Sequence, residues 1–273
     1  MSSDQLQHTP LGRPSEYPTE YDPGQLCPLP RSLSWQAYGY DRAPWTGVDT
    51  WNAWEISWLN SQGLPQVAVG VFQVPADSAN IIESKSLKLY LNSLSQSSFA
   101  SMDEINGVIA KDLSSCAGSK VLTELYSLED IVHPVQLSSG QCIDSLDVSI
   151  ADYQRDAGLL ALQGNTDVEE TLYSHLLKTN CPVTGQPDWG SVVVTYRGRQ
   201  IQREALLKYI VSFRGVCDFH EQCTETIFLD IMQQCKPSEL TVHTRYLRRG
   251  GIDINPWRSN SQAAPTNSRL SRQ

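Results

Sequence analysis

The sequence lacks an apolar run of membrane-spanning length. Its longest apolar stretch, residues 67–72, has only the length of a strand. A basic start followed by an apolar core is also missing from the first residues, so we expect no secretory signal. These absences predict a cytoplasmic protein with no membrane partner.

Common metal and nucleotide motifs are missing as well. The seven cysteines have no CxxC spacing and the five histidines are scattered, so we expect no metal site and interpret the cysteines as reduced thiols. The sequence contains neither GxGxxG nor GxxxxGK[ST], which excludes the Rossmann fingerprint and the P-loop.

An excess of positive charge is the third absence. The chain has 21 basic and 30 acidic residues, a net charge of −9. Such a surface repels phosphate backbones, so we expect no direct binding of nucleic acid, although a local basic pocket for a small anion remains open.

What the 273 residues do contain is an apparent internal duplication. Residues 1–33 are rich in Pro, Gly and Tyr and are expected to form an extended arm, while residues 259–273 form a polar tail. Between them, each half reads as a strand pair, two helices and another strand pair. We therefore expect one module at 34–150 and a second at 151–273, the second including the tail.

The element assignments rest on periodicity. Helical spacing of apolar residues marks 83–94 and 203–213, and β-branched runs mark 67–71 and 192–196. Ser101 with Glu104, and Asp218 with Glu221, match capping boxes, and the glycines at 250–251 suit a hairpin turn. The predicted fold class is α+β, with antiparallel sheets backed by helices.

Cys181 and Asp188 lie in one loop dense in Pro and Gly. Cys181 is placed to be an exposed nucleophile, although a lone cysteine is more often a small buried hydrophobe. Asp188 follows Pro187, where an aspartate often only shapes a turn. Its functional alternative is a general acid, kept protonated by partial burial beside Trp189.

Two helix starts also carry candidate ligands. Glu221 is either the capping-box carboxylate or, with His220, a binder of an amidine-like base edge, since a carboxylate accepts two such hydrogen bonds. The run 83–88, ESKSLK, is either a solvated amphipathic helix start or a phosphate-recognising helix N-terminus with hydroxyl and ammonium donors.

Taken together, these motifs resemble one family. ESKSLKLYLNS at 83–93, NCPVTGQPDWG at 180–190, FHEQC at 219–223 and RYLRRGGIDINPWRSN at 245–260 are similar to blocks of the NADPH-dependent 7-cyano-7-deazaguanine reductases. These are the nitrile reductases of queuosine biosynthesis (QueF type). The resemblance covers nearly the whole chain and is to the long, two-module subgroup.

This resemblance implies tandem tunnelling-fold (T-fold) modules and a set of roles. Cys181 would attack the nitrile of 7-cyano-7-deazaguanine (preQ0) to give a covalent thioimide, and Asp188 would protonate the nitrile nitrogen. Two hydride transfers from NADPH would then give 7-aminomethyl-7-deazaguanine (preQ1). The remaining implied assignments are substrate binding by Ile82, Glu83, Ser84, His220 and Glu221, and NADPH binding by Ser84, Lys85, Arg249 and Gly250.

The open sheet edges of such modules also lead us to expect a homodimer. The family needs no metal. Two alternatives stay open at this point: another T-fold enzyme acting on a purine or pterin, such as a cyclohydrolase, and a non-catalytic purine-binding module. The missing zinc constellation and the presence of ESKSLK count against the cyclohydrolase, and the net charge counts against an RNA-associated module.

Overall fold

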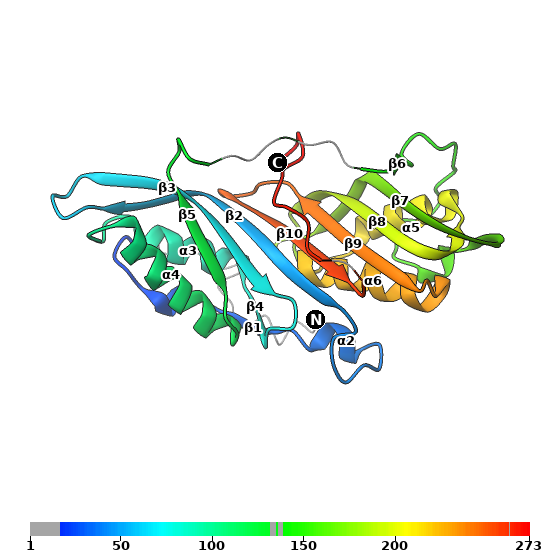
Figure 1. Ribbon diagram of the computed structural model, residues 1–273, viewed down its shortest axis with the longest axis horizontal. Helices are drawn as coiled ribbons and strands as arrows, with labels where there is room; N and C mark the ends of the chain where they lie inside the picture. Colours follow the sequence, from blue (N-terminus) through cyan, green and yellow to red (C-terminus); the bar gives the residue numbers. More distant parts are fainter. Residues whose placement is uncertain (1–16, 132–134, 136–138, 262) are drawn as a thin grey trace. The chain divides into compact units, whose positions relative to one another are not determined.

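The computed structural model of the chain describes residues 17–131, 135, 139–261 and 263–273 (Figure 1). Residues 1–16 of the expected arm lie outside this part of the chain. The described chain forms two compact units, each drawn from several stretches of sequence. The first unit contains 48–133 and 248–254 together with the N-terminal residues up to 33; the second contains 34–47, 134–247 and 255–273.

The first unit is an antiparallel sheet in the order β5-β3-β2, with two helices packed on one face (Figure 1). The apolar residues of the helices and the sheet share one core, which includes Trp51, Phe72, Leu87 and Ile109. Its main elements are β2 (Thr46–Leu59), β3 (Pro65–Pro75), α3 (Ser84–Ser93), α4 (Met102–Ala117) and β5 (Leu122–Tyr126).

The end of the expected arm is not separate from the regular structure. Its strand β1 (Pro28–Pro30) pairs with β4 (Asn80–Ile82) in a small antiparallel sheet, preceded by the short helix η1 (Pro23–Gln25). Leu29 is buried between two exposed prolines. Proline lacks the N–H that a central strand needs for hydrogen bonds on both sides. The PLP segment is therefore compatible with a two-stranded sheet, in which each strand is an edge strand.

The second unit repeats the plan more completely, with the strand order β10-β9-β8-β7-β6 and two helices on the sheet, α5 against β7 and α6 against β9 (Figure 1). Its elements are α2 (Leu33–Gln36), β6 (Gln141–Cys142), η2 (Ala157–Leu159), β7 (Leu162–Asn180), β8 (Pro187–Ile201), α5 (Arg203–Ser212), η3 (Phe213–Gly215), α6 (His220–Cys235), β9 (Glu239–Tyr246) and β10 (Ile252–Ser259). Strands β7 and β8, β8 and β9, and β9 and β10 pair antiparallel, whereas β6 pairs parallel with β7. The α+β class with antiparallel sheets backed by helices is therefore confirmed.

The two halves differ in one respect from the duplication expected from sequence. The second half supplies two strands, β9 and β10, after its helices, whereas the described part of the first half supplies only β5 to its own sheet. The compact units also cross the linear boundaries at 34–150 and 151–273. Residues 34–47 fold with the second unit because Tyr38 donates a hydrogen bond to the buried Asp230 at 3.0 Å.

The two expected capping boxes have different outcomes. At α4 the expectation is confirmed, since Ser101 Oγ accepts from the Glu104 N–H at 3.2 Å and the Glu104 carboxylate accepts from the preceding Ala100 N–H. At α6 it is wrong: the helix begins at His220, its N-cap residue is Phe219, and no side chain caps it.

Candidate functional site

In the second unit, Cys181 begins the turn that joins β7 to β8. Its N–H donates to the Gln186 carbonyl at 2.9 Å, and its own carbonyl accepts from the Gly185 N–H at 3.1 Å. The turn is thus closed on itself, and the cysteine is only 4% exposed. The expectation of an exposed nucleophile is wrong in this respect, because the thiol is buried within the turn.

Asp188 lies on the returning strand, directly across from Thr179. Side chains directly opposite each other on neighbouring strands share a face, so the Asp188 carboxyl faces the same way as Thr179, two residues before Cys181. Asp188 is 7% exposed and Thr179 is fully buried. The hairpin therefore brings the candidate acid to the strand end where the candidate nucleophile lies.

Trp189 does not shield Asp188 as expected. Successive residues of a strand point to opposite faces, and Trp189 is 41% exposed, with the Arg214 guanidinium 5.6 Å from its ring centroid. The burial of Asp188 must come from its own face of the sheet, where α6 packs.

His220, the first residue of α6, supplies that contact. Its Nε2 lies 3.3 Å from Asp188 Oδ2. Its ring stacks on Tyr246 of β9, with the centroids 3.8 Å apart and the planes at 8°. The imidazole is thus fixed between an aromatic ring and a carboxyl group, in hydrogen-bonding range of the latter.

Glu221 follows His220 in the first turn of α6 and is 2% exposed. Because no capping box forms here, the strongest structural alternative for this carboxylate is removed. The positive end of a helix dipole favours a negative charge at this place. The structure therefore brings four sequence-predicted residues to one region of the second unit: Cys181, Asp188, His220 and Glu221.

The surroundings add polar groups that sequence reasoning missed. Burial raises the pKa of Asp218 from 3.8 to about 6. Burial also raises the pKa of the Cys223 thiol well above its usual range, and the negative charge of Asp218 adds to this. Cys223 therefore stays a protonated thiol at neutral pH and is poorly suited to be the nucleophile of this region.

Tyr246 was missed too, although its position carries a signal. In the strand 239–246 it alternates with Val242 and Thr244, and Thr244 contacts Thr224 of α6 at 2.5 Å. A period of two would have placed Tyr246 on the helix-facing side. Its stacking partner, however, comes from a separate element and could not be read from the strand.

In the first unit, residues 82–85 at the start of α3 differ in burial and in hydrogen bonding. Ile82 is buried in the core, and the Glu83 carboxylate caps α3 by accepting from the Lys85 and Ser86 N–H groups at 2.6 and 2.8 Å. Burial raises the pKa of Glu83, and these hydrogen bonds oppose the rise. Ser84 and Lys85 are half-buried. The helix end therefore does not offer these two N–H groups to a phosphate, as one interpretation of ESKSLK required.

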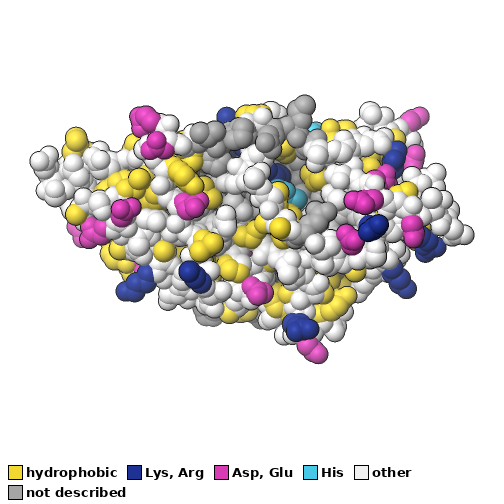
Figure 2. Space-filling view, in the orientation of Figure 1, with side chains coloured by type: hydrophobic (Ala, Val, Ile, Leu, Met, Phe, Trp, Pro, Cys, Tyr) yellow, Lys and Arg dark blue, Asp and Glu magenta, His cyan; other side chains and the backbone are white. Residues whose placement is uncertain are grey.

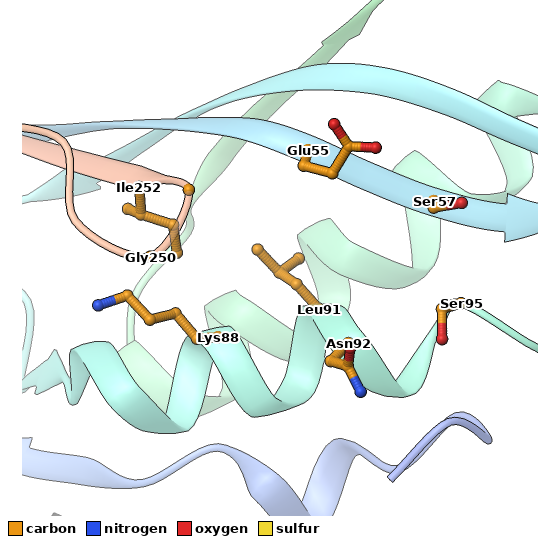
Figure 3. A pocket seen from close by; sticks show the side chains of 9 residues that line it. Glu55, Ser57, Lys88, Leu91, Asn92, Ser95, Gly250 and Ile252 are labelled. Carbon is orange, nitrogen blue, oxygen red and sulfur yellow. The ribbon is translucent and has the colours of Figure 1, made fainter. Parts of the chain in front are cut away.

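A groove of about 190 Å³ lies along the next turns of this helix, facing β2 and the turn at 248–251 (Figure 3). Lys88 reaches from α3 toward Gly250, while the Glu55 carboxylate points away from α3 (Figure 3). The groove is lined by Glu55, Ser57, Lys88, Leu91, Asn92, Ser95, Gly250, Gly251 and Ile252. Of the predicted cofactor residues only Gly250 lines it; Lys88 was quoted within the motif but not selected.

The turn beside this groove is held by Trp54. The Arg248 guanidinium lies 4.0 Å from the Trp54 ring centroid, and the Trp54 N–H donates to the Gly251 carbonyl at 2.9 Å. Arg249 closes the turn through hydrogen bonds with Ile252, and both glycines have positive φ, at 61° and 80°. The expected hairpin turn is confirmed.

Other features of the chain also bear on the function. All seven cysteines are free thiols. Within the described residues, no cluster of three or more His, Cys, Asp or Glu side chains is arranged to hold a metal ion. No helix in the described part of the chain has the length and apolar character needed to cross a membrane. Figure 2 shows acidic and basic side chains interspersed over the visible face.

Comparison with protein families gives two matches. Residues 17–125 match the family model described as "Nitrile reductase, 7-cyano-7-deazaguanine-reductase N-term". Residues 187–265 match the model described as "QueF-like protein". Together the matched ranges cover more than half of the chain and include every predicted site residue except Cys181, which precedes the second match.

Proposed function

The chain belongs to the family of 7-cyano-7-deazaguanine reductases, the nitrile reductases of queuosine biosynthesis, and we propose that it works through a thioimide on Cys181 with NADPH as reductant. It is thus an oxidoreductase, and its two α+β units are tandem T-fold modules. The observation that carries the proposed mechanism is the arrangement around the β7–β8 hairpin, where Asp188 and His220 meet 3.3 Å apart beside the turn of Cys181.

The first step is addition of the Cys181 thiol across the nitrile. The sulfur–carbon bond forms, one carbon–nitrogen π bond breaks, and the nitrogen takes a proton from Asp188. The proton lost by the thiol restores the acid, so the addition is balanced without another reactant. His220 holds the Asp188 carboxyl in place, and the burial of Asp188 excludes water that would compete for the proton.

Recognition of the base falls to Glu221 and His220. A carboxylate can accept two parallel hydrogen bonds from the N1–H and 2-amino group of a guanine-like edge. Glu221 is buried in the first turn of α6, so such bonds would form away from water and count for more. Ile82, Glu83 and Ser84 of the first unit remain proposed substrate contacts.

The residues of the first unit fit a phosphate-bearing cofactor. Lys88 supplies a cation in the groove, and a Cβ at Gly250 would come within 3.1 Å of its side chain, so the glycine keeps that space open. The groove is smaller than the roughly 300 to 1,000 Å³ of pockets that enclose a whole drug-sized ligand. It therefore suits one part of NADPH.

We assign Ser84, Lys85, Arg249 and Gly250 to the rest of this cofactor contact, with Lys88 added. When bound, NADPH supplies the hydrides that reduce the substrate. The contribution of these side chains is to hold its phosphates through charge-assisted hydrogen bonds. We further propose that the enzyme is a cytoplasmic homodimer that binds no nucleic acid directly.

The test is a titration with 7-cyano-7-deazaguanine in the absence of NADPH, followed by intact mass and near-ultraviolet absorbance. We expect one adduct per chain, mapping to Cys181. Cys181→Ala should lose both the adduct and turnover, whereas Cys217→Ala, which alters an exposed thiol, should keep both. Turnover retained by Cys181→Ala would remove the nucleophile assignment.

A further inference from the structure

The C-terminal tail is not a loose appendage but is packed on the sheet of the second unit. Ser268 and Leu270 are each 9% exposed. The Ser268 carbonyl accepts a hydrogen bond from Arg245, a buried residue of β9. The neighbours of Arg245 in β9, Thr244 and Tyr246, contact α6, so the tail lies on the face opposite the helix.

Arg272 and Gln273 reach β8, which carries Asp188, and β9, which carries the stacking partner of His220. Arg272 Nη2 donates to the carbonyl of Gly190 at 2.9 Å and to Ser191 Oγ at 3.0 Å, both on β8. The Gln273 side-chain amide donates to the carbonyl of Tyr246 on β9 at 3.0 Å. These attachments are made at a matched pair of strand positions, because Gly190 and Tyr246 are partners in the β8–β9 register.

Contacts connect this pair of strand positions to Asp188, the proposed acid. A Cβ on Gly190 would lie 3.1 Å from the Tyr246 ring, so ring and strand are already in close contact. The same ring stacks on His220, whose Nε2 lies 3.3 Å from Asp188 Oδ2. A shift of either strand end would therefore be passed through Tyr246 to His220 and Asp188.

We infer that Arg272 and Gln273 are positioning residues, which fix Tyr246 and thereby the His220–Asp188 pair. This inference rests on the proposed function, in which that pair supplies the proton for thioimide formation. Interactions that hold a reacting group in place act on the rate, and a displacement of about 1 Å can cost roughly a hundredfold. The tail thus contributes to the reaction without touching the substrate.

The experiment combines Arg272→Met and Gln273→Leu in the full-length chain. The rate of adduct formation with 7-cyano-7-deazaguanine is measured without NADPH across a pH series. We expect adduct formation in the double variant to be slowed roughly tenfold to a hundredfold, with an altered pH profile and with the protein still fully folded at the assay temperature. Ser271→Ala, at an exposed neighbouring position, should match the wild type, and Arg272→Lys should recover part of the rate.

A second readout does not depend on the chemistry. The Leu247 N–H bonds the Trp189 carbonyl at 2.9 Å between the two attached strands, so its hydrogen exchange should be faster in the double variant. A wild-type rate and pH profile, or unchanged exchange at Leu247, would overturn the inference. If the wild type itself forms no adduct, the proposed function fails, while the exchange measurement still decides whether the tail holds the strands.

Discussion

Asp188 is the single residue on which the proton chemistry depends. Asp188→Asn keeps the size of the side chain but removes the acidic proton, so we expect reduction to be lost and adduct formation to be slowed or stalled. The measurement is stopped-flow absorbance with and without NADPH. Trp189→Phe is the matched control, because its side chain lies on the opposite face and is 41% exposed. Normal rates in Asp188→Asn would leave the aspartate with only its turn-forming role.

Asp218 gives a pH-dependent effect on stability. Burial raises its pKa from 3.8 to about 6 in the folded state. The folded protein thus holds a proton that the unfolded chain releases, and this contribution to stability is lost as the pH rises from about 4 through about 6. The variant Asp218→Asn has no titrating carboxyl group at this position, so its stability does not carry this pH dependence.

We therefore expect the melting temperature of Asp218→Asn, measured relative to that of the wild type, to increase as the pH rises through this window. Thermal unfolding over a pH series checks it, with Asp167→Asn, at an exposed site, as the control. A constant difference between Asp218→Asn and wild type across the series would contradict the assignment of this titration to Asp218.

At the scale of elements, the turn at 248–251 offers a paired test of the cofactor site. Gly250 and Gly251 both have positive φ, so alanine at either position strains the backbone by about 1 to 2 kcal/mol. Only at Gly250 would the new Cβ meet Lys88, at 3.1 Å, whereas at Gly251 nothing lies within 4 Å. The pair therefore separates backbone strain from the contact with Lys88.

We expect Gly250→Ala to raise the KM for NADPH, with adduct formation in its absence unchanged, because Gly250 is assigned to the cofactor and not to the substrate. Gly251→Ala should lose comparable stability and keep a KM for NADPH close to that of the wild type. Steady-state kinetics and thermal unfolding measure both quantities. An equal rise of KM in the two variants would assign the effect to the turn as a whole and not to Lys88.

How far the sequence predicts an element depends on what fixes its ends. The start of α4 was predictable because Ser101 and Glu104 are local partners. The start of α6 was not predictable from local sequence. The Asp218 N–H donates a hydrogen bond to the Asn180 carbonyl, and Cys217 forms an isolated β-bridge with Asn180. A tertiary contact with the end of β7 thus holds residues before the helix in an extended form and overrides the local capping signal.

The candidate site shows the same limit. Sequence motifs selected Cys181, Asp188, His220 and Glu221, and the structure brings them to one region. The face on which each side chain lies was not predictable, because it depends on strand register and on the packing of α6. This is why Trp189 was expected beside Asp188 when Tyr246 with His220 fills that place.

At the scale of the whole molecule, the duplication could be predicted from the sequence, but the compact unit to which each segment belongs could not. Residues 34–47 begin the first module expected from sequence, yet Trp45 packs edge-on against Phe228 at 5.6 Å in the second unit. Such long-range pairs leave no periodicity in a single sequence. The packing of the polar tail expected at 259–273 was likewise not predictable, because the acceptors of Arg272 and Gln273 are mostly backbone carbonyls.

The oligomeric state is the last prediction. In the described residues β5 ends the strand order of the first unit's sheet, and Leu122 on it is 52% exposed. An open edge strand invites pairing with another chain, so we expect a homodimer with a sedimentation mass twice the 30.4 kDa of one chain.

Leu122→Lys should weaken the dimer, because a charge on an edge strand opposes pairing. Leu64→Lys, at a leucine 61% exposed in the β2–β3 turn, should not. A wild-type protein that sediments as a stable monomer would contradict the prediction, and equal weakening by both lysines would move the interface away from β5.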